Sequence, residues 1–160
     1  DGAANIEKVT IHGYEYQLRW QPFDSTRLMF SNALISMTAE NTDLSRVAES
    51  TGETTDKIVR QTRESAPTHS RSAMLVQQLP FNLQASVMYF RSSSMRWRRN
   101  GDPIQASERF DWRLAKAFRW GSSRGEVAYT VQNANEAQEG RFGGYRYADK
   151  SSWLSLRLDF

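Results

Sequence analysis

The sequence predicts an all-β fold, an antiparallel transmembrane β-barrel to which this chain contributes about seven strands. Three observations lead to this prediction. Segments of alternating apolar and polar residues recur along the chain, the connections between them alternate between short and long, and aromatic residues gather near the segment ends. A length of 160 residues corresponds to one domain, so we expect residues 1–160 to be part of a single barrel.

The first two strands are expected over residues 6–20 and 26–38. In the first strand, every second residue is apolar over Tyr14, Tyr16, Leu18 and Trp20. The alternation changes phase at Gly13, which indicates a β-bulge. Residues 21–25 contain Pro22 and are typical of a turn.

A polar stretch, residues 40–66, is expected to form a long loop with short local helices. It consists mostly of Thr, Ser, Glu, Asp and Arg, and its few apolar residues suggest helical turns near Leu44 and near Ile58. Thr54 or Thr55 is expected to cap the second of these turns.

The third and fourth strands are expected over residues 70–79 and from Leu83 onwards, joined by a tight turn. The fourth strand alternates clearly as far as Tyr89 and is expected to continue to Trp97. A strong turn signal follows at residues 98–103, which include an Asn-Gly pair.

The remaining strands are expected over residues 110–120, around residues 127–131 and over residues 153–160. A Gly-rich turn at residues 121–125 joins the first two of these strands. A polar, Gly-rich loop at residues 134–150 leads to the last strand.

The last strand alternates most clearly. Its apolar face consists of Leu154, Leu156, Leu158 and Phe160, and Trp153 lies on the opposite face. In a transmembrane barrel, apolar residues meet lipid, polar residues face the lumen and an aromatic residue lies at the interface. This ending resembles the C-terminal signal of bacterial outer-membrane proteins, and we expect these five residues to be recognised by the barrel-assembly machinery. An ordinary half-buried strand is the alternative.

The connections form a pattern that does not depend on any single strand. The short connections follow Trp20, Leu79 and Trp120, and the long ones follow Thr38, Trp97 and Asn133. Outer-membrane barrels have short periplasmic turns and longer extracellular loops. If the last strand ends in the periplasm, all short turns lie there and all long loops lie outside. The aromatic residues near both ends then form two girdles.

Composition narrows the classes of protein. The absence of cysteine excludes disulfides, thiolate metal sites and a cysteine nucleophile. No run of 18 apolar residues occurs, and the mean hydropathy is −0.68, so a transmembrane helix is excluded, whereas strands hide their hydrophobicity in alternation. Asp1 follows no leader sequence, so we expect a signal peptide to be absent or already removed.

Catalytic and metal-binding patterns are missing from the sequence. His12 and His69 are far apart and neither has the spacing of a metal ligand. No Gly-x-Ser-x-Gly motif or phosphate-binding glycine loop is present. We therefore expect no enzymatic activity, no cofactor and no bound metal.

Arginines near the outer loop form one candidate site. Arg96, Arg98 and Arg99, with Arg91 close by, make a basic cluster that we expect to contact an anionic ligand or lipopolysaccharide phosphates. A solvated rim is the alternative. The other arginines are scattered along the strands and the net charge is only +3, so no nucleic-acid partner is expected.

Four segments carry a resemblance to a known family. They are Ile11–Pro22, with its Gly-x-Glu strand and Pro turn, Phe110–Phe118, Gly125–Asn133 with its Gln-Asn ending, and Leu154–Phe160. In this order they resemble barrel strands of TonB-dependent receptors, the last three being similar to the antepenultimate, penultimate and terminal strands. Together they span nearly the whole chain.

The resemblance implies a receptor in the outer membrane of a Gram-negative bacterium, with a 22-stranded barrel filled by an N-terminal plug. Such receptors import a scarce ligand, such as a ferric siderophore or another metal chelate, with energy from the TonB complex, which pulls on the plug. Implied partners are outer-membrane lipid, the barrel-assembly machinery, the TonB complex through a missing plug region, and a small-molecule metal chelate.

The chain departs from this family in having no plug and an odd number of strands. We expect it to be the C-terminal part of a larger receptor, although an eight-stranded barrel, with residues 1–9 as a separate strand, is an alternative. Two other functions remain open: a small passive or structural outer-membrane barrel, and a soluble lipocalin-like binding barrel whose apolar residues face inward.

Overall fold

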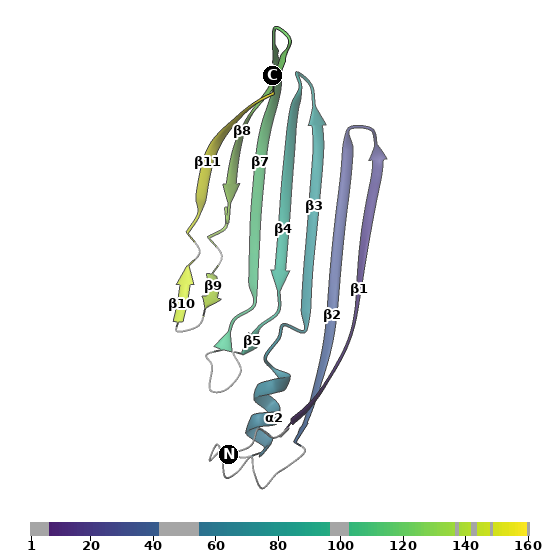
Figure 1. Cartoon of the computed structure of the whole chain (residues 1–160), viewed down its shortest axis with the longest axis vertical. Helices are drawn as coiled ribbons and strands as arrows, with labels where there is room; N and C mark the ends of the chain where they lie inside the picture. Colours follow the sequence, from purple (N-terminus) through teal and green to yellow (C-terminus); the bar gives the residue numbers. More distant parts are fainter. Residues whose placement is uncertain are drawn as a thin grey trace.

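The computed structural model describes residues 7–41, 55–96, 103–136, 138–141, 144–147 and 149–159. Its main element is an antiparallel sheet of seven strands in the order β1-β2-β3-β4-β7-β8-β11 (Figure 1). These strands are β1 (Glu7–Phe23), β2 (Thr26–Asn41), β3 (His69–Leu79), β4 (Leu83–Ser92), β7 (Ser107–Trp120), β8 (Ser123–Gln132) and β11 (Ser151–Asp159). The predicted all-β class and antiparallel arrangement are confirmed.

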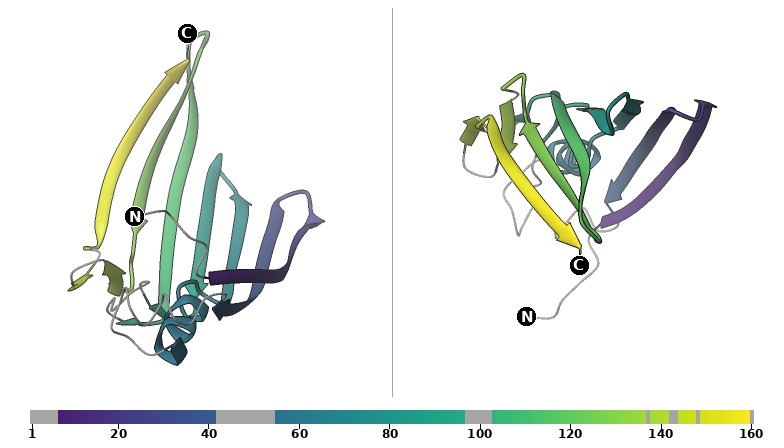
Figure 2. Two further views of the ribbon diagram at one scale, coloured as in Figure 1. Left: turned by 60° about the horizontal axis from the view of Figure 1, so that its bottom comes forward. Right: turned by 90° about the horizontal axis from the view of Figure 1, so that it is seen from above.

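The sheet is curved but open. β1 and β11 form its two edges, and each has one neighbouring strand in the sheet. Figure 2 shows these edges at opposite sides of the sheet. The described strands therefore do not close into the barrel that the sequence predicts.

Short and long connections lie at opposite ends of the sheet (Figure 1). Three tight turns join β1 to β2, β3 to β4 and β7 to β8 at one end, here called the turn end, where β11 also finishes. The other end, the loop end, holds α2 (Thr55–Arg63), β5 (Met95–Arg96), β6 (Pro103–Ile104), β9 (Gln138–Arg141) and β10 (Gly144–Tyr147). The predicted alternation of short and long connections is confirmed.

β1 and β2 form a longer hairpin than predicted. The turn expected at residues 21–25 narrows to residues 24–25, because the strand continues past Trp20 to Phe23. The pairing register shifts between these two residues. Pro22 lies within this shift, where a residue without an N–H group is tolerated.

Gly13 does not form the predicted bulge. It pairs with Ile35 in an unbroken register, so Val9 and Ile11 lie on the opposite face of the sheet from the aromatic residues that follow. A side chain at Gly13 would meet the carbonyl oxygen of Leu34 at 2.6 Å. The close approach of two backbones, rather than a bulge, explains the glycine.

The region predicted as a loop at residues 40–66 begins as strand and ends as helix. β2 continues to Asn41, and α2 begins at Thr55, so the second predicted helical turn is confirmed. The turn predicted near Leu44 and the capping residue Thr54 lie outside the described residues. Among the described residues, no helix is long and apolar enough to cross a membrane.

Two connections differ from the prediction. β4 ends at Ser92 instead of continuing to Trp97, and β5 then pairs with β6 in a separate small sheet. Trp97 and residues 98–102 of the turn expected at 98–103 lie outside the described residues, and Pro103, the last residue of that turn, begins β6. The stretch predicted as a loop at residues 134–150 contains β9 and β10, two paired strands of four residues each, in which only Tyr145 and Tyr147 alternate with a polar residue.

Candidate functional site

The sheet has one apolar face that extends across all seven strands. Strand pairing places Trp20, Leu28, Leu75, Val87, Trp112 and Val131 in one row. The neighbouring row towards the turn end contains Ala85, Leu114, Tyr129 and Leu154. Because alternate residues of a strand point to one face, these rows form a continuous surface, which we call the apolar band.

Most of the apolar band is uncovered, although Val131 within it is only 2% exposed. Leu18 is 58% exposed, Trp20 57%, Leu154 72% and Leu156 65%. A groove of about 330 Å³ runs along the band and is lined by Leu18, Phe30 and Leu75, among others. Soluble proteins rarely expose a contiguous apolar surface of this extent.

Polar residues limit the apolar band at both ends. On β7 it lies between Glu108 and Lys116, eight positions apart and hence about 27 Å along the strand. On β3 it lies between Arg71 and Gln77, six positions apart and hence about 20 Å. With the tilt of about 35–45° that barrel strands have, these lengths correspond to heights of about 20 Å and about 15 Å, somewhat less than the apolar belt of about 25 Å that transmembrane barrels present to lipid.

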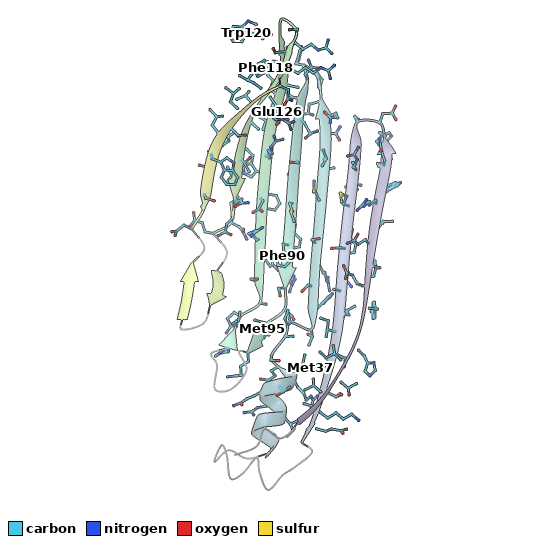
Figure 3. All side chains as sticks on the ribbon, viewed as in Figure 1. Met37, Phe90, Met95, Phe118, Trp120 and Glu126 are labelled. Atoms are coloured by element: carbon cyan, nitrogen blue, oxygen red, sulfur yellow. The ribbon has the colours of Figure 1, made fainter. Side chains whose placement is uncertain are left out.

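Aromatic side chains collect at the turn end. Phe118 and Trp120 lie there (Figure 3), and the exposed fractions are 80% for Trp120, 69% for Phe23 and 85% for Phe81. Phe81 has a φ of 65°, a conformation that bulky residues rarely adopt. Phe81 is thus an exposed aromatic residue held in a tight turn. Exposed aromatic residues at the strand ends are typical of the interfacial girdles of transmembrane barrels.

The opposite face of the sheet carries most of its charged and small residues. Arg113 donates a hydrogen bond to Glu126, Arg109 pairs with Asp111 at 3.1 Å, and the hydroxyls of Ser31 and Ser72 lie 2.7 Å apart. Ala115 and Ala128, which pair with each other, also belong to this face. Its apolar residues include Met29, Met74, Met88 and Phe90 of the middle strands. We call it the polar face.

A polar pocket of about 460 Å³ lies at the loop end. Its walls include Arg63 of α2, Thr68, Ser94 and the predicted ligand-contact residue Arg96. The Arg96 Nε atom lies 3.1 Å from the Oε2 atom of Glu64, and its backbone N–H donates to the Glu64 carbonyl at 2.7 Å. Arg96 therefore ties β5 to the end of α2 as well as lining the pocket.

The other predicted site residues are distributed differently. Leu154, Leu156 and Leu158 lie on the apolar band side of β11, and Trp153 lies on the polar face, as predicted. Phe160, Arg98 and Arg99 lie outside the described residues.

Sequence reasoning missed a polar cluster at the loop-end margin of the apolar band. His69 Nε2 lies 2.6 Å from Asn32 Oδ1 and 2.8 Å from Arg71 Nε, so this nitrogen either donates to the amide oxygen or accepts from the guanidinium group. Arg91 pairs with Glu108 at 3.1 Å on the neighbouring strands. One signal was present in the sequence: Arg71, Ala73 and Leu75 are alternate residues of one strand, so Arg71 lies on the apolar side with the other two.

Comparisons with protein families, curated proteins and solved structures give no match. Within the described ranges, no group of three or more His, Cys, Asp or Glu side chains is arranged to hold a metal ion.

Proposed function

We propose that this chain forms part of the wall of a transmembrane β-barrel in the outer membrane of a Gram-negative bacterium. The apolar band carries the proposal. It crosses every strand of the sheet, is largely exposed, and lies opposite a face that carries most of the charged residues of the sheet. In this arrangement lipid covers residues such as Leu18 and Leu156, which the chain itself leaves exposed.

The orientation follows from the connections. In the proposed barrel the tight turns face the periplasm, and the loop end, with α2 and the polar pocket, faces the outside. The aromatic residues Phe23, Phe81 and Trp120 lie at the periplasmic interface, and the cluster around Arg71 lies at the outer one.

We further propose that the barrel is a receptor for TonB-dependent uptake of a scarce ligand such as a ferric siderophore. The strand resemblance supports this assignment, and so do the free edges of β1 and β11, which cannot remain unpaired in lipid. Additional strands and a plug within the same polypeptide would satisfy both. The pocket beside Arg63 and Arg96 is the part of the described chain best placed to meet the ligand first.

The first test is the intact mass of the native polypeptide in detergent-extracted outer membranes. We expect a mass several times the 18.4 kDa of this chain. A membrane protein of 18.4 kDa would refute the receptor and leave a small passive or structural barrel. Finding the protein in the soluble fraction would refute the membrane location as well.

The second test separates lipid contact from a soluble barrel with an apolar interior. This chain has no cysteine, so L156C and S155C can each be labelled with a small fluorophore. In vesicles whose acyl chains are brominated, we expect strong quenching at residue 156 and weak quenching at residue 155, which lies on the polar face. Equal quenching at both positions, or quenching at neither, would contradict the proposed wall.

A further inference from the structure

Two arginines lie side by side at the loop-end margin of the apolar band. Arg71 of β3 is the direct cross-strand partner of Arg91 of β4. Side chains paired in this way have Cβ atoms about 5 Å apart, and like charges directly opposite destabilise a sheet unless something compensates them. Asn32 of β2 and Glu108 of β7 continue the same row.

The compensation within the row is incomplete. Arg91 Nη1 contacts Glu108 Oε1 at 3.1 Å, and both side chains are about half exposed. Arg71 contacts an imidazole instead of a carboxylate: its Nε and Nη2 atoms lie 2.8 Å and 3.2 Å from the two ring nitrogens of His69. When His69 Nε2 donates to Asn32 Oδ1 at 2.6 Å, Nδ1 is the ring nitrogen that accepts from Arg71 Nη2. Among the described residues of this row, two guanidinium groups thus face one carboxylate.

The position of this row indicates what neutralises it. The next residues of the same face towards the turn end are Ala73, which is half-buried, and Tyr89, and both line the apolar groove. A group bound between Arg71 and Arg91 therefore lies immediately above the apolar band. A phosphate with acyl chains attached matches both parts, because its oxygens accept from guanidinium groups while its chains lie along the band.

We propose that Arg71 and Arg91 bind the phosphate of a lipid headgroup at the outer margin of the apolar band. The proposal rests on the proposed membrane location. His69 and Asn32 position Arg71, and Glu108 orients Arg91. Free phosphate has the same headgroup chemistry, but it would make no use of the adjoining apolar surface.

The chain provides a matched control. Arg119 of β7 and Arg124 of β8 are also direct cross-strand partners, but they lie on the polar face at the turn end. R119Q/R124Q removes the same charge as R71Q/R91Q at a distant place, so it shows whether a change in quenching beside Ala73 is local or follows from the loss of charge in general.

The experiment uses the protein extracted from its own membrane, carrying A73C labelled with a fluorophore as a local reporter. It is reconstituted in phosphatidylcholine vesicles with a minor share of phosphatidic acid, and in each of two preparations one lipid has brominated chains. The two quenching values give the preference for phosphatidic acid beside Ala73. We expect a roughly 5-fold preference, the size produced by one net cationic charge at a lipid surface.

R71Q/R91Q should reduce this preference to near parity, whereas R119Q/R124Q should leave it unchanged. R71K/R91K should retain part of it, because charge remains but the paired donors are lost.

Equal quenching by both lipids in the unsubstituted protein would overturn the site while leaving the membrane location supported. Loss of the preference in millimolar inorganic phosphate, at constant ionic strength, would identify a free-phosphate site and overturn the lipid assignment. Quenching by neither lipid would overturn both proposals.

Discussion

At the scale of single residues, Gly13 is the clearest case of a side chain excluded by a neighbouring backbone. Any Cβ atom there would lie 2.6 Å from the Leu34 carbonyl oxygen, and a backbone atom cannot move aside as a flexible side chain would. We expect G13A to lower the free energy of unfolding by about 1–3 kcal/mol. Urea unfolding of the refolded protein in lipid vesicles would measure this.

E15A is the matched control for G13A, because Glu15 is the next residue of β1 on the same face and is exposed. We expect E15A to change the free energy of unfolding by no more than about 0.5 kcal/mol. If G13A were equally mild, the two strands would have to separate locally at no cost, and the close approach would not explain the glycine.

Single residues also mark the limit of what the sequence revealed. The parity of Arg71 placed it on the apolar side of β3, but parity alone does not show that Arg91 lies opposite it. Cross-strand partners depend on register, and register depends on the turn between the strands. The contact between Arg96 and Glu64 was missed for the same reason, since it joins two connections that are far apart in the sequence.

At the scale of elements, the terminal strand allows the two faces to be compared at adjacent positions. Leu156 pairs with Val127 within the apolar band, while Ser155 pairs with Ala128 on the polar face. We expect L156R to destabilise the folded protein in lipid by about 1 kcal/mol, because a cation would face hydrocarbon close to the margin that Lys116 of the same row marks.

S155R is the control for L156R, and its effect should stay within about 0.5 kcal/mol. The yield of folded protein in vesicles, followed by urea unfolding of each variant, gives both values. A larger loss for S155R than for L156R would mean that the polar face, and not the apolar band, meets the less polar surroundings.

The strands of the main sheet were predictable because alternation with a period of two is a local property. Each of the seven was placed from its own residues, with errors of a few positions at the ends. β9 and β10 were missed because they are short: Gln138–Arg141 contains no apolar residue, and Gly144–Tyr147 alternates over only three residues. The Gly13 prediction was wrong because a change in apolar parity resembles a bulge even when the register is unbroken.

At the scale of the whole molecule, strand direction constrains how the sheet can close. Six antiparallel pairings separate β1 from β11, so these two edge strands run in the same direction. An all-antiparallel barrel then needs an odd number of additional strands between them, which makes the total even, as is usual in bacterial barrels. We predict that β1 and β11 are never direct neighbours.

Cysteine cross-linking tests this prediction. Tyr16 of β1 and Leu154 of β11 lie at the two edges of the sheet, and we expect Y16C/L154C to give no intramolecular product with a short thiol cross-linker. L18C/F30C, a direct cross-strand pair on β1 and β2, should cross-link efficiently. An intramolecular product from Y16C/L154C would mean that the seven strands close on themselves through a parallel pair.

The hairpin of β1 and β2 rises beyond the rest of the sheet. Past Ile35, β2 has no partner in β3, so residues 36–41 continue for about 20 Å with β1 alone. We call this extension, residues 36–41 with their partners in β1, the stem. α2 and the residues that follow it pack against the stem: the Ser65 hydroxyl lies 3.8 Å from the Met37 sulfur, and Figure 3 shows Met37 beside the helix. In the proposed orientation, the stem extends outward past the ends of β3 and β4. Substitutions should then accumulate on the stem, while the wall beneath it stays constrained by the bilayer.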